Sequence, residues 1–289
     1  MSNYIFNFHY KTLILHPVFQ YMNKILYIFL LLVTLSSCSE YQKALKSEDT
    51  ATKFKLGEEL YNAGKYDKAN KLFAQIVPSY RGKPQAEKLM YLYSQSFYKM
   101  RDYYIAGYQF ERFASSYPQS EKLEEASFLS AKSNYMLSPA YTKDQKETKQ
   151  AIEKLQEFIN LFPDAEYVAE ANKLVKELDY KLELKSFSIA KQYDQISDFD
   201  ASIKSFDNFI FEFPGSVLRE DALFYKLDAS YKLAMNSVER KKELRLNSAK
   251  ASADMFKKSY PSSKYMEDVN DMASKVEEEL KNYGNKDNI

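Results

Sequence analysis

The sequence of 289 residues is poor in the side chains that many enzymes and metal proteins use. It contains one cysteine, two histidines and no tryptophan. A single cysteine excludes a disulfide within one molecule and a zinc site built from several cysteines. Both histidines, His9 and His16, lie in a segment that we interpret below as a leader. Without them, the remaining chain has no Ser-His-Asp or Cys-His nucleophilic site and no zinc site with histidine ligands.

Glycine is scarce as well, and neither sign of charge is in excess. Only six glycines and eight prolines occur, so phosphate-binding glycine loops are rare and a mostly helical chain is expected. The formal net charge of +1 gives no general attraction to nucleic acid or to an acidic surface. Acidic residues mostly alternate with lysine, which is typical of solvated helix faces and not of the paired carboxylates of a glycosidase. We therefore predict no enzymatic activity, no cofactor and no metal.

The first 37 residues have the character of a leader. Met22 is followed by a lysine and by the apolar run Ile25–Leu35, which is shorter than the roughly 20 residues that span a bilayer. This pattern predicts a signal peptide at residues 22–37. Leu35-Ser36-Ser37-Cys38 resembles the lipobox of bacterial lipoproteins, so we expect Cys38 to be the lipidated first residue of the mature chain. Residues 1–21 lack acidic groups, and we expect them to lie outside the working protein.

An ending made of two aromatic residues and a proline recurs along the rest of the chain. In the clearest copy, Phe113 and Tyr117 continue one apolar stripe of a helix, and Pro118 then ends that helix. The rule is phenylalanine, three residues, tyrosine or phenylalanine, then proline. The four copies close at Pro118, Pro163, Pro214 and Pro261. A small residue follows two positions after each proline: Ser120, Ala165, Ser216 and Ser263.

The segment from residue 54 to residue 76 resembles a tetratricopeptide repeat, which is a pair of helices packed through small residues. The matching residues are Gly57, Tyr61, Gly64, Tyr66, Ala69 and Phe73. Small side chains at Gly57 and Ala69 are expected where the two helices cross, because larger ones would prevent close approach. Gly64 is expected in the turn between them.

The repeated endings predict an all-α fold, a right-handed superhelix of about five tetratricopeptide-like helix pairs closed by a capping helix. We place a short polar tether at residues 38–50, the superhelix at 51–283 and a tail at 284–289. Residues 165–196 contain no glycine or proline and are expected to form one long helix. The charged segment Glu239–Glu243 is expected in a loop.

The lipobox, the short tether and the aromatic-proline endings together resemble the BamD family of bacterial lipoproteins, and the resemblance extends from Met22 to about Lys281. It implies a non-enzymatic component of the outer membrane β-barrel assembly machine, lipid-anchored on the periplasmic face. The implied partners are the POTRA domains of a BamA-like barrel protein and unfolded outer membrane proteins. We expect client capture at residues 51–118 and docking of the BamA-like partner at about 165–280.

In the repeat register, aromatic residues of the first helix of each pair face the concave side. The candidates for a peptide-binding groove are Phe54, Tyr61, Tyr91, Tyr98 and Lys99. An aromatic groove with a cation suits the aromatic C-terminal segment of a barrel protein. Packing between adjacent repeats is the alternative role for these side chains.

Other functions remain open from the sequence alone. A repeat lipoprotein that organises a division or peptidoglycan complex is the main alternative, although such proteins often carry a coiled coil before the repeats and this chain has only the short tether. A glycan-binding lipoprotein would use tryptophan, which is absent. A helical transglycosylase would need a separate catalytic domain, for which the predicted repeats leave no room.

Overall fold

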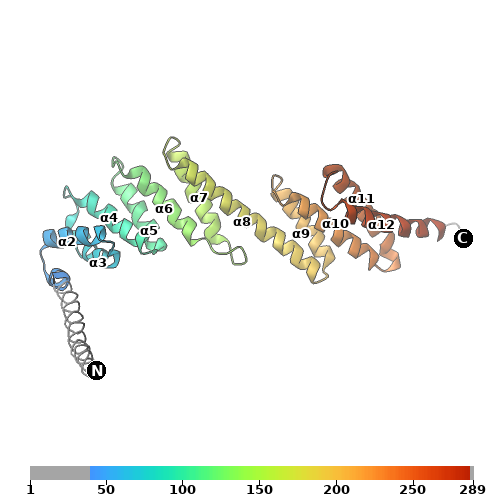
Figure 1. Ribbon diagram of the computed structural model, residues 1–289, viewed down its shortest axis with the longest axis horizontal. Helices are drawn as coiled ribbons and strands as arrows, with labels where there is room; N and C mark the ends of the chain where they lie inside the picture. Colours follow the sequence, from blue (N-terminus) through green and yellow to red (C-terminus); the bar gives the residue numbers. More distant parts are fainter. Residues whose placement is uncertain (1–39, 287–289) are drawn as a thin grey trace, which may run out of the picture. The chain divides into compact units, whose positions relative to one another are not determined.

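A computed structural model describes residues 40–286, where all regular secondary structure is helical (Figure 1). The chain divides after Ser133 into two compact units, each built from consecutive helices. The predictions for Cys38 and for the leader before it concern residues outside the described range. No helix in that range is both long enough and apolar enough to cross a membrane.

The first unit begins with a short helix at residues 40–46. Its further helices are α2 (Thr50–Asn62), α3 (Tyr66–Ile76), the 3-10 helix η1 (Val77–Tyr80), α4 (Ala86–Lys99), α5 (Tyr103–Ser116) and α6 (Leu123–Leu137), the last of which continues past Ser133. From α2 to α5, each helix packs against the next along the chain. The helices are amphipathic: α3, for example, buries Ala69, Leu72, Phe73 and Ile76, which share one face.

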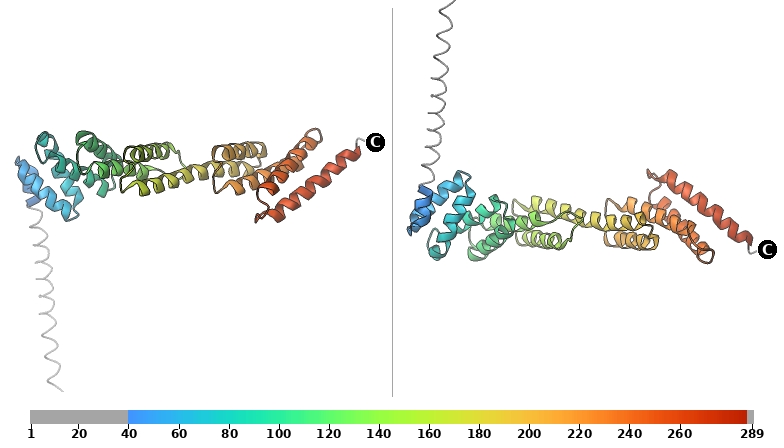
Figure 2. Two further views of the ribbon diagram at one scale, coloured as in Figure 1. Left: turned by 90° about the horizontal axis from the view of Figure 1, so that it is seen from above. Right: turned by 90° about the horizontal axis from the view of Figure 1, so that it is seen from below.

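The second unit continues this pattern with longer helices (Figure 2). They are α7 (Lys146–Leu161), α8 (Val168–Gln195), α9 (Phe199–Glu212), α10 (Arg219–Met235), α11 (Glu239–Ser259) and α12 (Met266–Lys286). Each of them packs against the next, so the core runs along the unit between neighbouring helices. The buried side chains of α8 fall into two groups, Ala171 to Leu178 and Phe187 to Ala190, and no residue between Leu178 and Phe187 is buried.

The predicted all-α architecture of successive helix pairs is confirmed, and so is the single long helix now seen as α8. The hand of the superhelix and the number of five pairs stay predictions. The expected loop at Glu239–Glu243 is wrong, because these residues form the first turns of α11, where Lys242 makes an ion pair of 2.8 Å with Glu279. The charged side chains in this segment are compatible with a solvated helix face.

Both ends of the described chain are more ordered than the sequence suggests. Residues 40–46 lie in the predicted tether but form a helix, because Tyr41 and Ala44 share an apolar face that is buried against Leu72. The predicted tail at 284–289 starts too early, because α12 continues to Lys286.

The crossing of α2 and α3 depends on Gly57, as the sequence predicts. A Cβ atom added at Gly57 would lie 2.5 Å from Cε1 of Phe73, which is fully buried. The missing side chain therefore lets the ring of Phe73 lie directly against the backbone of α2. Any larger residue would push the two helices apart.

Three turns between paired helices use the same left-handed backbone conformation. Gly64 has a φ angle of 74°, Arg101 of 64° and Ser197 of 63°. Each of these residues follows the first helix of its pair, and the second helix begins two residues later. At two of these turns, Arg101 and Ser197 thus adopt a backbone conformation that is unfavourable for residues with a side chain and costs glycine little.

The aromatic-proline ending closes each pair through a capping hydrogen bond and a ring contact. The backbone N–H of Tyr117 donates to the carbonyl of Phe113 at 2.9 Å, and the two rings lie 5.2 Å apart. The endings at Phe162, Phe213 and Tyr260 repeat the bond and the contact, with ring distances of 5.6, 5.4 and 5.7 Å. The second aromatic residue therefore belongs to the helix cap.

The serine two positions after the proline joins the turn to the helix that opened the pair. Its hydroxyl accepts a backbone hydrogen bond from the residue two positions later and donates to a glutamate at 2.6 Å. We call this arrangement the serine clasp. The clasps are Ser120 with Glu87, Ser216 with Glu183 and Ser263 with Glu220. The third copy has Ala165 at this position and cannot form one.

Candidate binding site on the first unit

Aromatic and charged side chains from α2, α4 and α6 come together around Glu125. The hydroxyl of Tyr91 in α4 hydrogen bonds to Glu125, which also pairs with Lys122 at 2.8 Å. Tyr61, at the end of α2, and Lys99, at the end of α4, are both within electrostatic reach of Glu125. We define the Glu125 cluster as Tyr61, Tyr91, Gln95, Lys99, Lys122 and Glu125.

Tyr91 is the structural centre of the Glu125 cluster. Its ring lies edge-on to Phe110 and Phe113, at centroid distances of 6.3 and 5.5 Å, which fixes the ring against the core of the α4–α5 pair. Its hydroxyl accepts a hydrogen bond of 2.8 Å from Nε2 of Gln95. The ammonium group of Lys122 lies 5.5 Å from the ring centroid. The side chain thus has a packed inner edge and a polar outer edge.

Titration of these groups is shifted by burial and by their neighbours. Burial raises the pKa of Tyr61 to about 12, with further contributions from Tyr66 and Glu125. Burial and the bond to Glu125 raise the pKa of Tyr91 as well. For Glu125, burial acts to raise the pKa, but the hydrogen bonds from Lys122 and Tyr91 and the charges of Lys122 and Lys99 outweigh it and lower the pKa. At neutral pH the tyrosines are therefore neutral donors beside an ionised carboxylate.

The other two predicted groove residues lie in different surroundings. Phe54 stacks on the buried Tyr80, with centroids 5.6 Å apart, and belongs to the core between α3 and α4. Tyr98 is edge-on to Tyr103 at 5.4 Å and to Phe110 at 6.3 Å. The structure therefore brings Tyr61, Tyr91 and Lys99 together around Glu125. The rings of all four aromatic candidates also pack against core clusters of the first unit.

Sequence reasoning missed Glu125, on which the three residues converge. Glu125 stands in a run of charged residues that resembles an ordinary solvated helix start. The available signal was its position, because Ala126 follows Pro118 by eight residues, as Ala222 follows Pro214. That spacing places Glu125 beside the packed face of α6.

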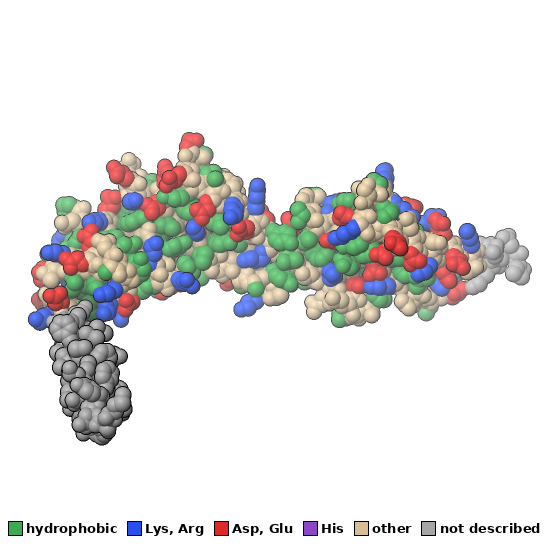
Figure 3. All heavy atoms as spheres, viewed as in Figure 1, with side chains coloured by type: hydrophobic (Ala, Val, Ile, Leu, Met, Phe, Trp, Pro, Cys, Tyr) green, Lys and Arg blue, Asp and Glu red, His purple; other side chains and the backbone are tan. Residues whose placement is uncertain are grey.

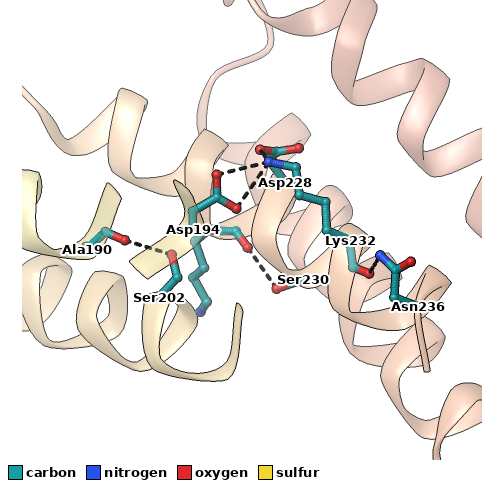
Figure 4. A network of polar contacts seen from close by, with 8 residues as sticks. Ala190, Asp194, Ser202, Asp228, Ser230, Lys232 and Asn236 are labelled. Atoms are coloured by element: carbon teal, nitrogen blue, oxygen red, sulfur yellow. Dashed lines mark hydrogen bonds and ion pairs between the residues drawn. The ribbon is translucent and has the colours of Figure 1, made fainter. Parts of the chain in front are cut away.

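The second unit has a polar network of its own, made of Asp194, Asp228 and Lys232 (Figure 4). The ammonium nitrogen of Lys232 lies 2.9 Å from Oδ2 of Asp194 in α8 and 2.6 Å from Oδ2 of Asp228 in α10. Burial is the largest influence on the pKa of Asp228 and raises it, and Asp194 and Asp268 add to this, against the opposing effect of Lys232. In this network one lysine pairs with both carboxylates.

Among the described side chains, no group of three or more histidine, cysteine or acidic residues is placed to hold a metal ion. Positive and negative side chains are interspersed over the viewed face, without a large area of one sign (Figure 3). The Glu125 cluster offers hydrogen-bond donors and acceptors beside aromatic rings.

A family described as outer membrane lipoprotein, YfiO, matches residues 46–246. A protein of Aquifex aeolicus (strain VF5), named as an outer membrane protein assembly factor, BamD, is 26% identical over 215 residues, which are 73% of this chain and 70% of that protein.

Two solved structures of tetratricopeptide-type repeats are also similar to the chain. The TPR2AB-domain complex of yeast Sti1 is 13% identical with a TM-score of 0.38, covering 79% of this chain and 98% of that one. The TPR-like repeats of a Podospora anserina kinesin light chain are 11% identical with a TM-score of 0.30, covering 73% and 96%.

Proposed function

Because the chain belongs to the YfiO family of outer membrane lipoproteins, we propose that it is a non-enzymatic factor in the assembly of outer membrane proteins. In this proposal, a lipid on Cys38 holds the protein on the periplasmic face of the outer membrane. The first unit captures unfolded outer membrane proteins, and the second unit docks on the POTRA domains of a BamA-like barrel protein. The relative named as an assembly factor supports the general role.

One residue, Ser39, separates the proposed anchor at Cys38 from the first described helix. That helix, at 40–46, buries Tyr41 and Ala44 against Leu72 of α3, so the start of the folded part is fixed to the first helix pair. A lipid on Cys38 would therefore hold the first unit close to the membrane surface. Cys38→Ala should leave the leader uncleaved or release the protein into the periplasm. Unchanged fractionation and mature mass would contradict the anchor.

The observation that carries the client-binding proposal is the convergence of Tyr61, Tyr91 and Lys99 on Glu125. An extended peptide offers backbone donors and acceptors along its length, and the Glu125 cluster offers an ionised carboxylate, an amide and an ammonium group at hydrogen-bonding edges of aromatic rings. A C-terminal aromatic residue of a client would add a ring contact and a carboxylate for Lys99.

The test of client binding changes Tyr61, which is only partly buried, and Lys99, which is exposed. Tyr61→Ala combined with Lys99→Ala should weaken binding of a C-terminal barrel peptide about tenfold, the equivalent of roughly 1.4 kcal/mol. The matched control is Tyr104→Ala with Tyr108→Ala, which removes two exposed tyrosines from α5. Equal affinity of the two double variants for the peptide would overturn the proposal. Circular dichroism of both variants checks that helicity is unchanged.

Docking of the BamA-like partner on the second unit is supported by its surface. The inner polar network of Asp194, Asp228 and Lys232 is already satisfied, while Arg240 and Lys241 at the start of α11 are exposed. Charges at the rim of an interface mainly set association rate and partner choice. Arg240→Glu with Lys241→Glu should reduce co-purification of the partner and spare peptide binding. Weaker peptide binding with unchanged co-purification of the partner would show that the two tasks are assigned to the wrong units.

A further inference from the structure

Two helix pairs of the protein, α4–α5 and the second half of α8 with α9, carry equivalent residues at sequence positions that differ by 96. The clasp glutamates Glu87 and Glu183, the left-handed turn residues Arg101 and Ser197 and the clasp serines Ser120 and Ser216 all differ by this number. The aromatic cores agree as well. Tyr91 lies edge-on to Phe110 and Phe113, and the equivalent Phe187 lies edge-on to Phe206 and Phe209.

In the α4–α5 pair, the helix α3 covers the face of α4 that points away from α5. Leu89 is 1% exposed and Ser96 is fully buried on this face. Leu89 packs with Phe73 and Ile76 of α3, and the hydroxyl of Ser96 accepts a hydrogen bond of 2.8 Å from the amide nitrogen of Asn70 in α3. One amphipathic helix therefore fills this side of the pair.

The equivalent face of α8 has no such cover. Its residues, 96 positions later, include Ile189, Gln192, Tyr193 and Ile196 in place of Tyr93, Ser96, Phe97 and Met100. Ile189 is 40% exposed, Tyr193 36% and Ile196 65%, whereas Phe97 is only 8% exposed. Figure 3 shows uncovered hydrophobic side chains over this part of α8 and α9. We call the residues Ile189, Gln192, Tyr193 and Ile196 the open face of α8.

The open face exists because α8 starts earlier than its register requires. The residue equivalent to Ala86, where α4 begins, is Leu182, but α8 begins at Val168. These additional fourteen residues (182 minus 168) move the preceding helix about 21 Å along α8. α7 packs against α8, and the loop before α7 reaches α8 at Lys185, whose ammonium group donates to the carbonyl of Lys143 at 2.8 Å. Beyond Lys185 the helix position that α3 occupies in the first unit is empty in the described chain.

We propose that this position receives one amphipathic α-helix of a partner protein, which lies on α8 as α3 lies on α4. The chemistry of the open face selects such a partner. The charged residues around it are engaged by other elements: Lys185 donates to the carbonyls of Tyr141 and Lys143, Lys191 lies 4.0 Å from the ring centroid of Tyr225, and Asp194 is paired with Lys232. The four residues of the open face carry no charge themselves, so the face offers little to lipid headgroups. An apolar ridge at helical spacing, with one polar side chain opposite Gln192, fits it.

This inference stands apart from the proposed function, because it does not depend on which protein supplies the helix or on client capture by the first unit. It is tested with the full lipidated chain. Gln192→Cys places a thiol on the open face, and Ser96→Cys, at the equivalent covered position, is the matched control. Phe211→Cys, at an 86% exposed site of α9, is the second control.

The thiols are labelled with a maleimide in native membranes and in the purified protein. We expect Gln192→Cys to react at least ten times more slowly in membranes than after purification, Phe211→Cys to react fast in both and Ser96→Cys slowly in both. Crosslinking from residue 192 should then reach one helical segment of another protein. Adding Ile189→Glu and Ile196→Glu should restore labelling and abolish that crosslink without changing the melting temperature.

Three results would overturn the proposal. One is equal labelling of Gln192→Cys in membranes and in the purified protein. Another is crosslinking to a second copy of this chain, which would make the open face a self-association surface. The third is protection of the thiol by protein-free phospholipid vesicles alone.

Discussion

The pair α4–α5 and the pair formed by the second half of α8 with α9 have the same interior and different surroundings. Both place three aromatic rings at the same register positions, and both close with a serine clasp. They differ outside the pair. Tyr98 of the first pair corresponds to Asp194 of the second, which is tied to Lys232, and the buried Ser96 corresponds to the exposed Gln192. The repeat therefore specifies how two helices pack, while individual surface residues specify what the pair binds.

The largest expected effect tests whether the two interiors are energetically alike. Phe110→Ala and Phe206→Ala each remove a fully buried ring at the same register position. We expect both to destabilise their own unit by about 3–5 kcal/mol, since each leaves a cavity in a packed core. Hydrogen exchange measured by mass spectrometry, which reports each unit separately, is the suitable measurement. If only one of the two variants lost stability, the two interiors would not be energetically alike.

A smaller effect tests the difference between the covered and the open face. Phe97→Ala should cost about 3 kcal/mol, because the ring is buried, whereas Tyr193→Ala at the equivalent position should cost under about 1 kcal/mol in the isolated protein. Chemical denaturation of purified variants measures both. If the two losses were equal, another part of the chain would have to cover Tyr193 in solution.

The serine clasps should contribute less. Ser120→Ala and Ser216→Ala each remove a partly buried hydrogen bond to a glutamate, and we expect a loss of about 1 kcal/mol for each. Ser→Cys at the same positions is the control for side-chain volume, because its thiol is a weak donor. The pair closed at Pro163 already has Ala165 at this position, so Ala165→Ser should change stability little. A large gain from Ala165→Ser would indicate an unrecognised acceptor near that turn.

The smallest effects concern pH and should have opposite signs in the two units. The pKa of Glu125 is lowered in the folded state, so its contribution stabilises the fold above its ordinary value of 4.5 and is lost as the pH falls below it. Burial raises the pKa of Asp228, so ionising this group costs stability as the pH rises. Glu125→Gln should therefore lower the melting temperature slightly at pH 7, and Asp228→Asn should leave it unchanged or raise it.

These pH effects are measured by thermal melts of both variants and the wild type at pH 3 and pH 7. As the pH falls toward 3, the contribution of the ionised Glu125 carboxylate is progressively lost, so the difference between Glu125→Gln and the wild type should shrink. A lower melting temperature for Asp228→Asn at pH 7 would mean that its pairing with Lys232 outweighs the cost of burial.

Local rules in the sequence were sufficient for the helix pairs. Prolines after aromatic residues ended the helices where the structure ends them, and Gly57 marked the crossing of α2 and α3 because only a missing side chain admits Phe73 there. Gly64, expected in the turn between α2 and α3, has the positive φ angle that suits glycine there. Each of these features depends on residues that are close in sequence or on a fixed repeat spacing.

Features that depend on contacts between distant elements were not predictable in this way. Glu125 is an ordinary charged residue until α2, α4 and α6 bring tyrosines and a lysine to it. The charged residues from Glu239 to Glu243 are compatible with a loop and with a helix surface. Their position shortly before the buried Leu246 is what favours the helix. The open face of α8 is likewise visible only after both of its packing partners are placed.

The added length of α8 also has a rotational consequence. Fourteen residues make about 3.9 turns, so α9 leaves the helix on nearly the same side as it would without them. Removing one residue from the unburied stretch between Leu178 and Phe187 would instead turn everything after it by about 100° around the helix axis. Removing seven would restore the phase to within about 20°. The length of this helix is therefore free to vary only in steps of about seven or eleven residues.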